Sequence, residues 1–365
     1  MSTRVAIVGS VGVPARYGGF ETLAEALVHQ LPASQYFLHV YCQRSAYAEA
    51  ERQPMLNGHR RIFVPLPANG AASMLYDALS VLDAVLHRRC TVVLCLGASG
   101  TLLFPLLRLL CPWVRIVFNL DGLESRRAKW SRLGKAVLHG LEALGVRFAH
   151  CVVADNRVIR SLVFHRFGRR ARVIAYGGDH ARPNGPQQAP AKALPSRYVL
   201  AISRIVPENN IDTILAAFAS SEGPHLVYVG NWEGSDYGRM LRERHAENSR
   251  IHLLDPIYEP QTLNHLRTRA LACVHGHSVG GTNPALVEAL YWAPQILAFD
   301  CGFNRATLDG QFSYWHDVQG LQRQLAALDA LQAPSPPCLQ RLRDRYRWSE
   351  IARGYAQTFE RGHAP

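Results

Sequence analysis

Short apolar runs alternate along the chain with segments in which apolar and polar residues recur at helical spacing. In the first half the apolar runs include RVAIV at 4–8, YFLHVYC at 36–42, TVVLCL at 91–96 and VRIVFNL at 114–120. Helix-like segments such as FETLAEALVHQL at 20–31 lie between them. Strands that are apolar throughout and alternate with helices predict a parallel sheet that is covered by helices on both faces.

This alternation stops once, at a stretch of different composition. Residues 182–197, RPNGPQQAPAKALPSR, are rich in Pro, Ala and Gln, which is typical of a linker. Beyond it the pattern starts again with YVLAIS at 198–203, HLVYVG at 225–230 and QILAFD at 295–300. We therefore predict an α/β protein made of two doubly wound Rossmann-like domains that face a central cleft, with ligands at the carboxyl ends of the strands.

The predicted domain boundaries follow from that break. An N-terminal domain covers 1–182, a linker covers 183–197, a C-terminal domain covers 198–340, and a helical tail covers 341–365. The tail is amphipathic over much of its length. We expect it to pack across both domains or to cross back to the N-terminal one.

Composition and charge narrow the choice of partners. The 40 Lys and Arg exceed the 28 Asp and Glu, which gives a formal net charge of +12 and suits nucleic acid, an anionic membrane or phosphorylated ligands. No nucleic-acid motif accompanies the charge, so a nucleic-acid partner is not expected. Residues 90–107 carry no charge, but Pro105 and a GASG loop predict strand, loop and helix there rather than a membrane span. The N-terminus leads directly into a strand, so we expect no signal peptide.

A glycine-rich loop, GSVGVPARYGG at 9–19, follows the first strand and opens a helix. Its spacing matches neither the dinucleotide fingerprint nor the P-loop, so neither of those cofactors is expected. An ordinary turn between strand and helix would also explain the glycines. Packing does not readily explain Arg16, Tyr17 and Glu21, which we take as candidates for binding an acceptor.

A second polar group, FNLDGLESRRAKW at 118–130, ends another strand of the first half. Asp121 and Glu124 would lie at the carboxyl end of the sheet, where a carboxylate can bind hydroxyls or take a proton. A helix N-cap is the competing explanation for Asp121. Arg126 and Arg127 beside them are further candidates for acceptor binding.

The second half carries two more such loops. In ISRIVPENNIDTIL at 202–215, Arg204 can clamp a diphosphate, Glu208 follows it, and either Asn209 or Asn210 can be a plain N-cap.

In HGHSVGGTNPALVE at 275–288, a zinc site would need a third ligand besides His275 and His277, and none has suitable spacing. We therefore expect no metal. Four loop residues present backbone N–H groups at the start of the next helix and form an anion pocket. The carboxylate of Glu288 lies one turn inside that helix. Those loop residues are Gly280, Gly281, Thr282 and Asn283.

Taken together, these motifs resemble the retaining GT-B glycosyltransferases of family 4, and more narrowly their bacterial rhamnosyltransferase branch, which builds surface polysaccharides. The resemblance runs nearly end to end. It implies that Glu288 holds the nucleotide ribose, that Arg204 grips the donor diphosphate, and that Gly18 and Gly19 approach the donor phosphates and the acceptor. The other implied donor contacts come from the loops already named: Glu208, Asn209, His277 and residues 280–283.

The sequence departs from the broad family at three of its positions. The first glutamate of the family's E-x₇-E motif falls on Gly280, the usual diphosphate lysine falls on Asn209, and the usual active-site histidine falls near Asp121. The donor sugar would then be held by other groups, namely Asp121, Glu124 and the backbone of 280–283. Ser125 also stands where an aromatic residue is expected, which leaves the acceptor open.

The implied function is transfer of rhamnose from dTDP-rhamnose, with retention, onto a lipid-linked saccharide. No protein nucleophile is evident, which is consistent with a front-face mechanism in which the departing diphosphate helps to deprotonate the acceptor. Asp121, Glu124 and Arg204 are the candidate catalytic residues, and no cofactor is expected. A UDP- or GDP-sugar donor and a GT-B-fold epimerase remain alternatives. A phosphorylase would need a pyridoxal-phosphate lysine, and no lysine occurs after residue 197.

Two groups of basic residues suggest an anionic membrane as a partner. A solvated helix face is the competing explanation, and it stays open. We predict a cytoplasmic protein that associates peripherally with the inner face of the plasma membrane, in an undetermined oligomeric state. The first group consists of Arg126, Arg127, Lys129, Arg132 and Lys135, and the second of His165, Arg166, Arg169, Arg170 and Arg172.

Overall fold

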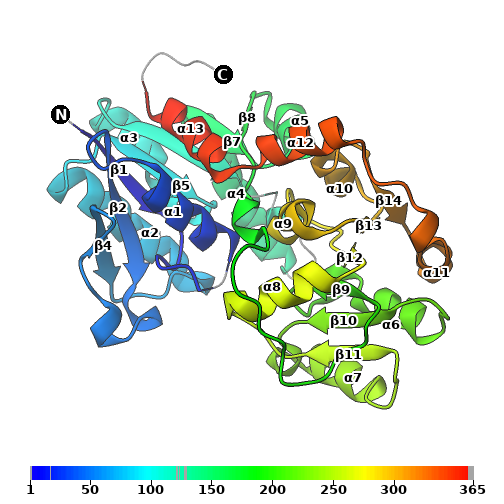
Figure 1. Ribbon diagram of the computed structural model, residues 1–365. Coiled ribbons are helices and arrows are strands. Elements are labelled where there is room, and N and C mark those ends of the chain that lie inside the picture. Colours follow the sequence, from blue (N-terminus) through cyan, green and yellow to red (C-terminus); the bar gives the residue numbers. More distant parts are fainter. Residues whose placement is uncertain (1, 17, 121, 123, 127–129, 361–365) are drawn as a thin grey trace. The chain divides into compact units, whose positions relative to one another are not determined.

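The computed structural model describes residues 2–16, 18–120, 122, 124–126 and 130–360 (Figure 1). The chain divides into two compact units. The N-terminal unit comprises the residues up to Tyr176 together with those from Trp348 onward, and the second unit comprises Gly177–Arg347. Each unit is a parallel sheet covered by helices, as the sequence predicts.

The sheet of the N-terminal unit has the strand order β3-β4-β2-β1-β5-β6-β7-β8. Its strand pairs are parallel except for β3 with β4, which is antiparallel. The central strands are buried along nearly their whole length, which explains their continuous apolar sequences. The bounds are β1 Thr3–Val8, β2 Tyr36–Gln43, β3 Met55–Leu56, β4 His59–Val64, β5 Val92–Leu96, β6 Arg115–Leu120, β7 Cys151–Ala154 and β8 Arg172–Val173.

The helices of this unit form two layers. Crossovers between parallel strands are right-handed, so the step from β1 to β2 and the steps from β4 through β8 place their helices on opposite faces of the sheet. Helix α1 (Gly19–Gln30) therefore lies on one face, where it contacts α13 (Trp348–Phe359). The other layer contains α2 (Ser73–Leu82) with the π-helical turn η4 (Asp83–His87), η5 (Ser99–Leu103) with α3 (Phe104–Leu110), α4 (Arg132–Phe148) and α5 (Arg157–Phe167).

The C-terminal tract is broken into two helices that belong to different units. Helix α12 (Pro336–Arg345) lies in the second unit, whereas α13 joins the N-terminal one. There the side-chain amide of Asn119 donates a hydrogen bond to the hydroxyl of Tyr355 at 2.8 Å. Gly354 also packs against Ile174, where an added Cβ would lie 3.3 Å from that side chain. The predicted boundary at 341 is therefore replaced by one at 347.

The second unit has six parallel strands in the order β11-β10-β9-β12-β13-β14. Its core contains buried aliphatic residues from the strands together with Trp232 and Trp315. The strands are β9 Tyr198–Ile202, β10 His225–Val229, β11 Ile251–Leu254, β12 Ala272–His275, β13 Ile296–Phe299 and β14 Ser313–Trp315. The helices are α6 Ile211–Ala219, α7 Asp236–Arg244, α8 Pro260–Arg269, α9 Pro284–Trp292, α10 Gly302–Thr307, α11 Val318–Ala326 and α12.

The segment predicted as an interdomain linker, 183–197, lies wholly within the second unit. It packs along α8, where the Gln188 N–H bonds the Gln261 carbonyl at 3.2 Å and the Asn264 amide bonds the Asn184 carbonyl at 2.9 Å. The chain instead passes between the units at 176–177. The linker prediction failed because prolines and glutamines suit a surface segment that packs along a helix as well as they suit a flexible linker between domains.

Candidate functional site

Two loops of the second unit meet where the neighbouring strands β9 and β12 end. One contains the 3₁₀ turn η8 (Pro207–Asn209), and the other is the glycine loop that precedes α9. The N–H and the hydroxyl of Ser278 both donate to the Glu208 carbonyl, at 3.0 and 2.9 Å. The sheet topology thus brings the two motifs from 202–215 and 275–288 together.

Asn209 and His277 join these loops from the inside. Both side chains are buried, and His277 Nδ1 lies 2.7 Å from Asn209 Oδ1. The Asn209 amide nitrogen donates to the Arg204 carbonyl at 2.6 Å and to the Ser203 hydroxyl at 3.2 Å. The contacts seen for these two side chains are therefore with other groups of the protein. Their predicted contacts with a nucleotide-sugar donor stay predictions.

Arg204 and Glu208 differ from those buried residues. Arg204 is exposed and Glu208 is partly exposed. Within the part of the chain that the structure describes, no hydrogen bond or ion pair engages the Arg204 guanidinium or the Glu208 carboxylate. A guanidinium without a partner at the end of a buried strand can bind an anion through two parallel hydrogen bonds. The role of Arg204 in binding a diphosphate stays a prediction.

The glycine loop ends in a cap on α9. Asn283 is the N-cap residue, and its side-chain oxygen accepts from the Ala285 N–H at 3.0 Å. Gly280 has a φ of 104°, which a residue with a side chain rarely adopts. Gly281 and Thr282 are buried. The first turn of α9 presents N–H groups and the positive end of the helix dipole, which favours an anionic ligand.

Glu288 lies in the second turn of α9 and is held by two side chains that the sequence analysis did not identify. Arg267 Nη2 of α8 lies 2.8 Å from its Oε2, and His180 Nε2 lies 3.3 Å from its Oε1. The Glu288 side chain keeps 21% of its surface exposed and that of Arg267 keeps 9%. The carboxylate is therefore fixed on a side chain that is partly exposed.

The charge state of Glu288 follows from these partners. Burial alone would raise the pKa of this carboxyl, but the hydrogen bond from His180 and the charge of Arg267 outweigh it and lower the pKa. The group is therefore a carboxylate at neutral pH. Each oxygen has more than one lone pair, so it can accept a further hydrogen bond from a hydroxyl.

His180 reaches α9 because the chain approaches that helix closely at the start of the second unit. It lies in the turn η7 (Asp179–Ala181), and a Cβ added to Gly178 just before it would lie 2.8 Å from the Val287 carbonyl carbon. No local pattern marks His180. Arg267 follows the buried Leu266 on α8. An arginine on the buried side of a helix was therefore the only sequence feature that could have identified it as a partner of Glu288.

In the N-terminal unit, the glycine loop between β1 and α1 is held by Glu21. This buried carboxylate accepts from the Val11 N–H at 2.7 Å. Gly18 has a φ of 124°, and a Cβ there would lie 2.0 Å from Glu21 Oε2, while a Cβ at Gly19 would meet the ring of Tyr176 at 3.4 Å. The contact with the loop explains Glu21 structurally. Its role in acceptor binding stays a prediction.

Of the other predicted acceptor residues, Arg16 is exposed and pairs with Glu51 at 2.6 Å. Tyr17 and Arg127 lie outside the described residues, as does the side chain of Arg126.

Asp121 also lies outside the described residues, whereas Glu124 is partly buried and accepts from Trp130 Nε1 at 3.1 Å. Ser125, which replaces the expected aromatic residue, is buried. Its N–H and hydroxyl donate to the two oxygens of Glu142 at 2.9 and 2.7 Å. The serine is therefore bound to a buried carboxylate of α4.

His275 is the remaining residue of the glycine-loop motif. It is buried, and burial lowers the pKa of its imidazole to about 3, so the ring is neutral. Its Nε2 has no hydrogen-bond partner. Among the described residues, no group of three or more His, Cys, Asp or Glu side chains is arranged to hold a metal ion.

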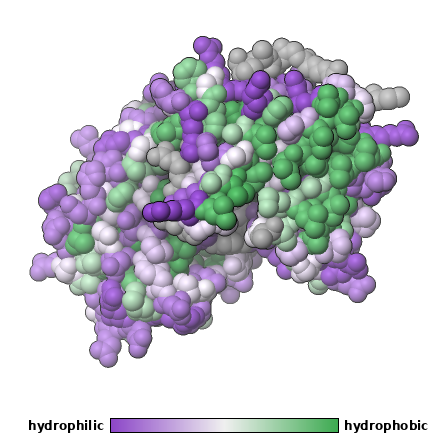
Figure 2. Space-filling model, turned by 180° about the vertical axis from the view of Figure 1, so that it is seen from behind, coloured by the Kyte–Doolittle hydropathy of each residue, from purple (hydrophilic) through white to green (hydrophobic). Residues whose placement is uncertain are grey.

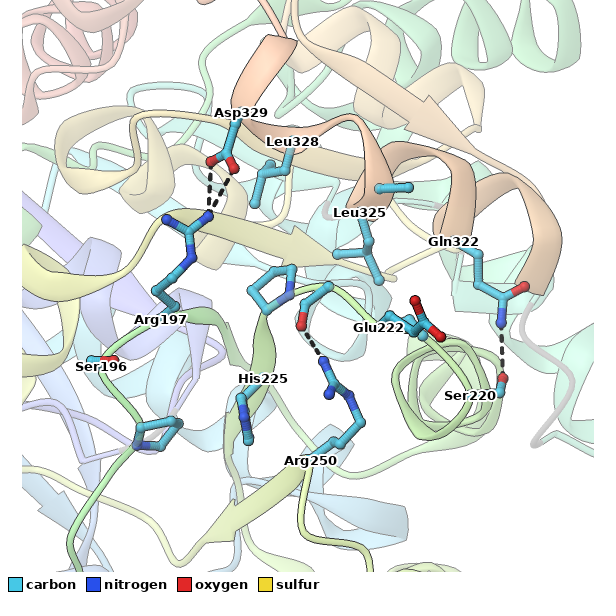
Figure 3. A pocket seen from close by; sticks show the side chains of 15 residues that line it. Ser196, Arg197, Ser220, Glu222, His225, Arg250, Gln322, Leu325, Leu328 and Asp329 are labelled. Atoms are coloured by element: carbon cyan, nitrogen blue, oxygen red, sulfur yellow. Dashed lines mark hydrogen bonds and ion pairs between the residues drawn. The ribbon is translucent and has the colours of Figure 1, made fainter.

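A pocket of about 920 Å³ lies elsewhere in the second unit, before the amino ends of β9, β10 and β11 (Figure 3). Arg197 forms two hydrogen bonds with Asp329, at 2.9 and 2.8 Å, and Arg250 donates to the Gly223 carbonyl. Gln322 donates to Ser220 at 2.8 Å. Ligands of doubly wound folds bind at the opposite, carboxyl ends of the strands. These polar groups are paired with one another, and we assign the pocket no ligand.

Comparisons with known proteins agree with this architecture. The family described as "Domain of unknown function (DUF1972)" matches residues 2–179. A search of curated proteins gave no match.

Three solved structures show the breadth of the likeness. Sucrose-phosphate synthase from Thermosynechococcus elongatus is 16% identical over 97% of this chain and 98% of that chain, with a TM-score of 0.79. A structure described as "Trehalose-6-phosphate from E. coli bound with UDP-2-fluoro glucose" is 10% identical over 98% and 99%, with a TM-score of 0.70. The apo form of the lipopolysaccharide outer core galactosyltransferase WaaB is 13% identical over 98% and 99%, with a TM-score of 0.66.

At these identities the likeness shows the fold. It is the GT-B fold of two Rossmann-like domains, as predicted. Among the described residues, no helix is both long and apolar enough to cross a membrane.

Proposed function

We propose that this chain is a glycosyltransferase that uses a nucleoside diphosphate sugar as donor. The observation that carries the proposal is Glu288, an ionised carboxylate on a partly exposed side chain. Arg267 and His180 fix it one turn inside α9, the helix that follows the glycine loop. A carboxylate in that position can accept a hydrogen bond from a hydroxyl of the nucleotide's pentose, which is the 3′-hydroxyl in a dTDP-sugar. The fold supports the proposal, because similar structures include a galactosyltransferase and a protein bound to UDP-2-fluoroglucose.

In this proposal the donor lies along the carboxyl ends of β9 and β12. Glu288 accepts a hydrogen bond from the pentose of the nucleotide, and the diphosphate lies against Gly280–Thr282 at the start of α9. Arg204 is exposed and its guanidinium has no partner among the described residues, so it neutralises the diphosphate as negative charge develops during sugar transfer. Glu208, Asn209, His277 and Asn283 complete this side of the proposed donor site.

The finer assignment rests on the resemblance of the sequence motifs. We propose dTDP-rhamnose as donor, retention at the anomeric carbon, and a lipid-linked saccharide as acceptor in the synthesis of a surface polysaccharide. The N-terminal loop at 16–21 and the segment at 121–127 would bind the acceptor. The leaving diphosphate would take part in deprotonating the acceptor hydroxyl, with Asp121 and Glu124 placed nearby.

We also propose that the enzyme needs no metal and works at the cytoplasmic face of an anionic membrane. The basic groups at 126–135 and 165–172 would attract it there by charge, and such attachment weakens as salt rises.

The decisive experiment incubates the full-length protein with a polyprenyl-diphosphate saccharide and a panel of dTDP-, UDP- and GDP-sugars, with and without EDTA. We expect nucleotide release and a lengthened saccharide with dTDP-rhamnose, and no loss of activity with EDTA. Release with another nucleotide sugar would correct the donor only. If no donor binds or reacts while the protein is folded by circular dichroism, the proposed function is wrong.

A further inference from the structure

The exposed large hydrophobic residues of this protein are not scattered over its surface. Of 15 such residues among the described part of the chain, 12 lie on one helical layer of the N-terminal unit. Single exposed apolar residues are normal in soluble proteins, but a concentration on one face marks an interaction site. The twelve are Leu75, Leu79, Leu82, Leu86, Leu102, Leu106, Leu109, Leu110, Trp113, Leu133, Val137 and Phe164.

Their spacing shows that they form outward-facing stripes. On α2 and η4 the exposed leucines recur at 75, 79, 82 and 86, which is one face of a helix. The face turned toward the sheet carries the buried Tyr76, Asp77, Ser80 and Val81. Helix α2 and η4 therefore present four leucines to the surroundings in addition to their buried face. The same spacing recurs at 102, 106 and 109 on η5 and α3, where Leu109 is 75% exposed.

The stripes adjoin one another. Helix α2 contacts η5, and both η5 and α3 contact α4, which adds Leu133 at 77% exposure and Val137. Figure 2 shows a broad hydrophobic area on the surface of this unit. We call the exposed side of this layer, formed by the twelve residues above, the leucine face.

The charges around the leucine face have one sign. Between residues 58 and 178, no Asp or Glu in the described part of the chain is exposed. Asp77, Glu142 and Asp155 are buried, and Asp83 pairs with Arg88 at 3.0 Å. The exposed arginines of the same layer are Arg89, Arg108, Arg132, Arg147, Arg157, Arg160, Arg166 and Arg170.

We infer that the leucine face inserts into the interfacial region of an anionic lipid bilayer. Leucines and a tryptophan on one side with arginines at the margin are the composition of interfacial helices, whose apolar side chains enter the boundary between headgroups and acyl chains. A second copy of the chain is the poorer occupant, because a two-fold interface on this face would oppose the same arginines without carboxylates between them.

This inference goes beyond the attachment by charge proposed above and does not depend on the sugar transfer. Attachment by basic residues alone is lost at high salt. Burial of apolar side chains is not screened by salt, so part of the binding must persist there.

The test uses the full-length protein and vesicles of phosphatidylglycerol and phosphatidylcholine at 0.1 M and 0.5 M NaCl. We expect the parent to sediment with vesicles at both salt concentrations. The triple variant Leu82→Ser, Leu106→Ser, Leu109→Ser should bind at least tenfold more weakly at 0.5 M NaCl. The matched control is Met240→Ser, Tyr258→Ser, which removes two exposed apolar residues of the second unit and should bind like the parent.

A second measurement follows Trp113 itself and does not rely on weakening the binding to vesicles. Trp113 fluorescence, obtained as the difference between the parent and Trp113→Phe, should shift to the blue with vesicles and be quenched by brominated lipids. The inference is overturned if the parent releases all vesicles at 0.5 M NaCl, if the triple variant binds like the parent, or if the Trp113 signal does not change. It is also overturned if the lipid-free parent is a dimer that the triple variant dissociates.

Nucleotide-sugar binding, measured without vesicles, separates this inference from the proposed function. The triple variant should keep the donor affinity of the parent, because its changes lie in the other unit from Glu288. Vesicle binding without donor binding would refute only the proposed function. Donor binding without salt-resistant vesicle binding would refute only the leucine face.

Discussion

Glu288 shows how a single carboxylate becomes a defined hydrogen-bond acceptor. Its two oxygens are approached by side chains from α8 and η7, which are separate segments of the second unit. A carboxylate that was merely exposed would rotate and would pay an entropic cost on binding a ligand. Here Arg267 and His180 hold it in place.

Glu288→Gln should weaken donor binding by about tenfold or more, because an amide offers one oxygen acceptor in place of two and carries no charge. Isothermal titration with the free nucleotide diphosphate measures the loss. Glu243→Gln, at an exposed position of α7, is the matched control and should bind normally. Equal affinity of Glu288→Gln and the parent would remove Glu288 from the donor site.

Asp77 gives the N-terminal unit a pH dependence of its own. Burial raises the pKa of this carboxyl from 3.8 to about 7, although hydrogen bonds from Ser99 and the Gly9 backbone oppose the shift. Because the folded state then holds a proton that the unfolded state has released, the contribution to stability falls as pH rises from about 4 to about 7.

Asp77→Asn should remove this dependence. Between pH 5 and pH 7 the parent loses about 1.4 kcal/mol per pH unit at most from this group, and the variant does not. Urea unfolding at the two pH values gives the difference. A pH profile shared by parent and variant would show that Asp77 is ionised in the folded protein.

Among the elements, α4 illustrates how a helix is adapted to the sheet beneath it. Ser131 caps its start by accepting from the Gly134 N–H at 3.1 Å. Gly145 faces the buried ring of Phe118 on β6, and a Cβ there would lie 2.4 Å from the ring. Gly140 of the same helix is exposed, with no atom within 4 Å of an added Cβ.

These two glycines predict opposite effects of one substitution. Gly145→Ala should destabilise the protein by about 1–3 kcal/mol, because Phe118 is fully buried and cannot easily move. Gly140→Ala should stabilise it by about 0.5–1 kcal/mol through helix propensity. Thermal unfolding of both variants measures the contrast. Equal effects of the two would mean that α4 does not pack on β6 in this way.

At the scale of the whole chain, the N-terminal unit is completed by the end of the sequence. Helix α13 brings the buried Tyr355, whose hydroxyl accepts from Asn119, and the Thr358 carbonyl, which accepts from Arg115 at 2.5 Å. The N-terminal unit is therefore discontinuous in sequence, whereas the second unit is continuous.

Truncation after Arg347 should unfold the N-terminal unit and spare the second one. Limited proteolysis followed by mass spectrometry should then give protected fragments from 177–347 only. Tyr355→Phe is the milder control, which should cost about 1 kcal/mol because it removes one hydrogen bond. Equal protection of both units in the truncated chain would show that α13 is dispensable.

The class of the fold and the positions of the main motifs follow from local patterns in the sequence. Buried parallel strands need continuous apolar runs, so the alternation with helices predicted both sheets. The sequence places Arg204 after a strand and Glu288 inside the helix that follows the next glycine loop, and their roles in donor binding stay predictions. Apolar runs and residues near strand ends are local features, so they can be recognised in the sequence.

Which distant residues meet depends on how the segments pack in the folded protein. The pairing of His180 with Glu288, the return of α13 to the N-terminal unit and the packing of 184–188 along α8 each join segments that share no local pattern. The leucine face was hidden for another reason. The spacing of apolar residues at 75, 79, 82 and 86 is typical of a buried helix face, and only their exposure in the folded protein shows that they face outward. Helical periodicity records the separation of two faces, whereas the surrounding protein decides which of them is covered.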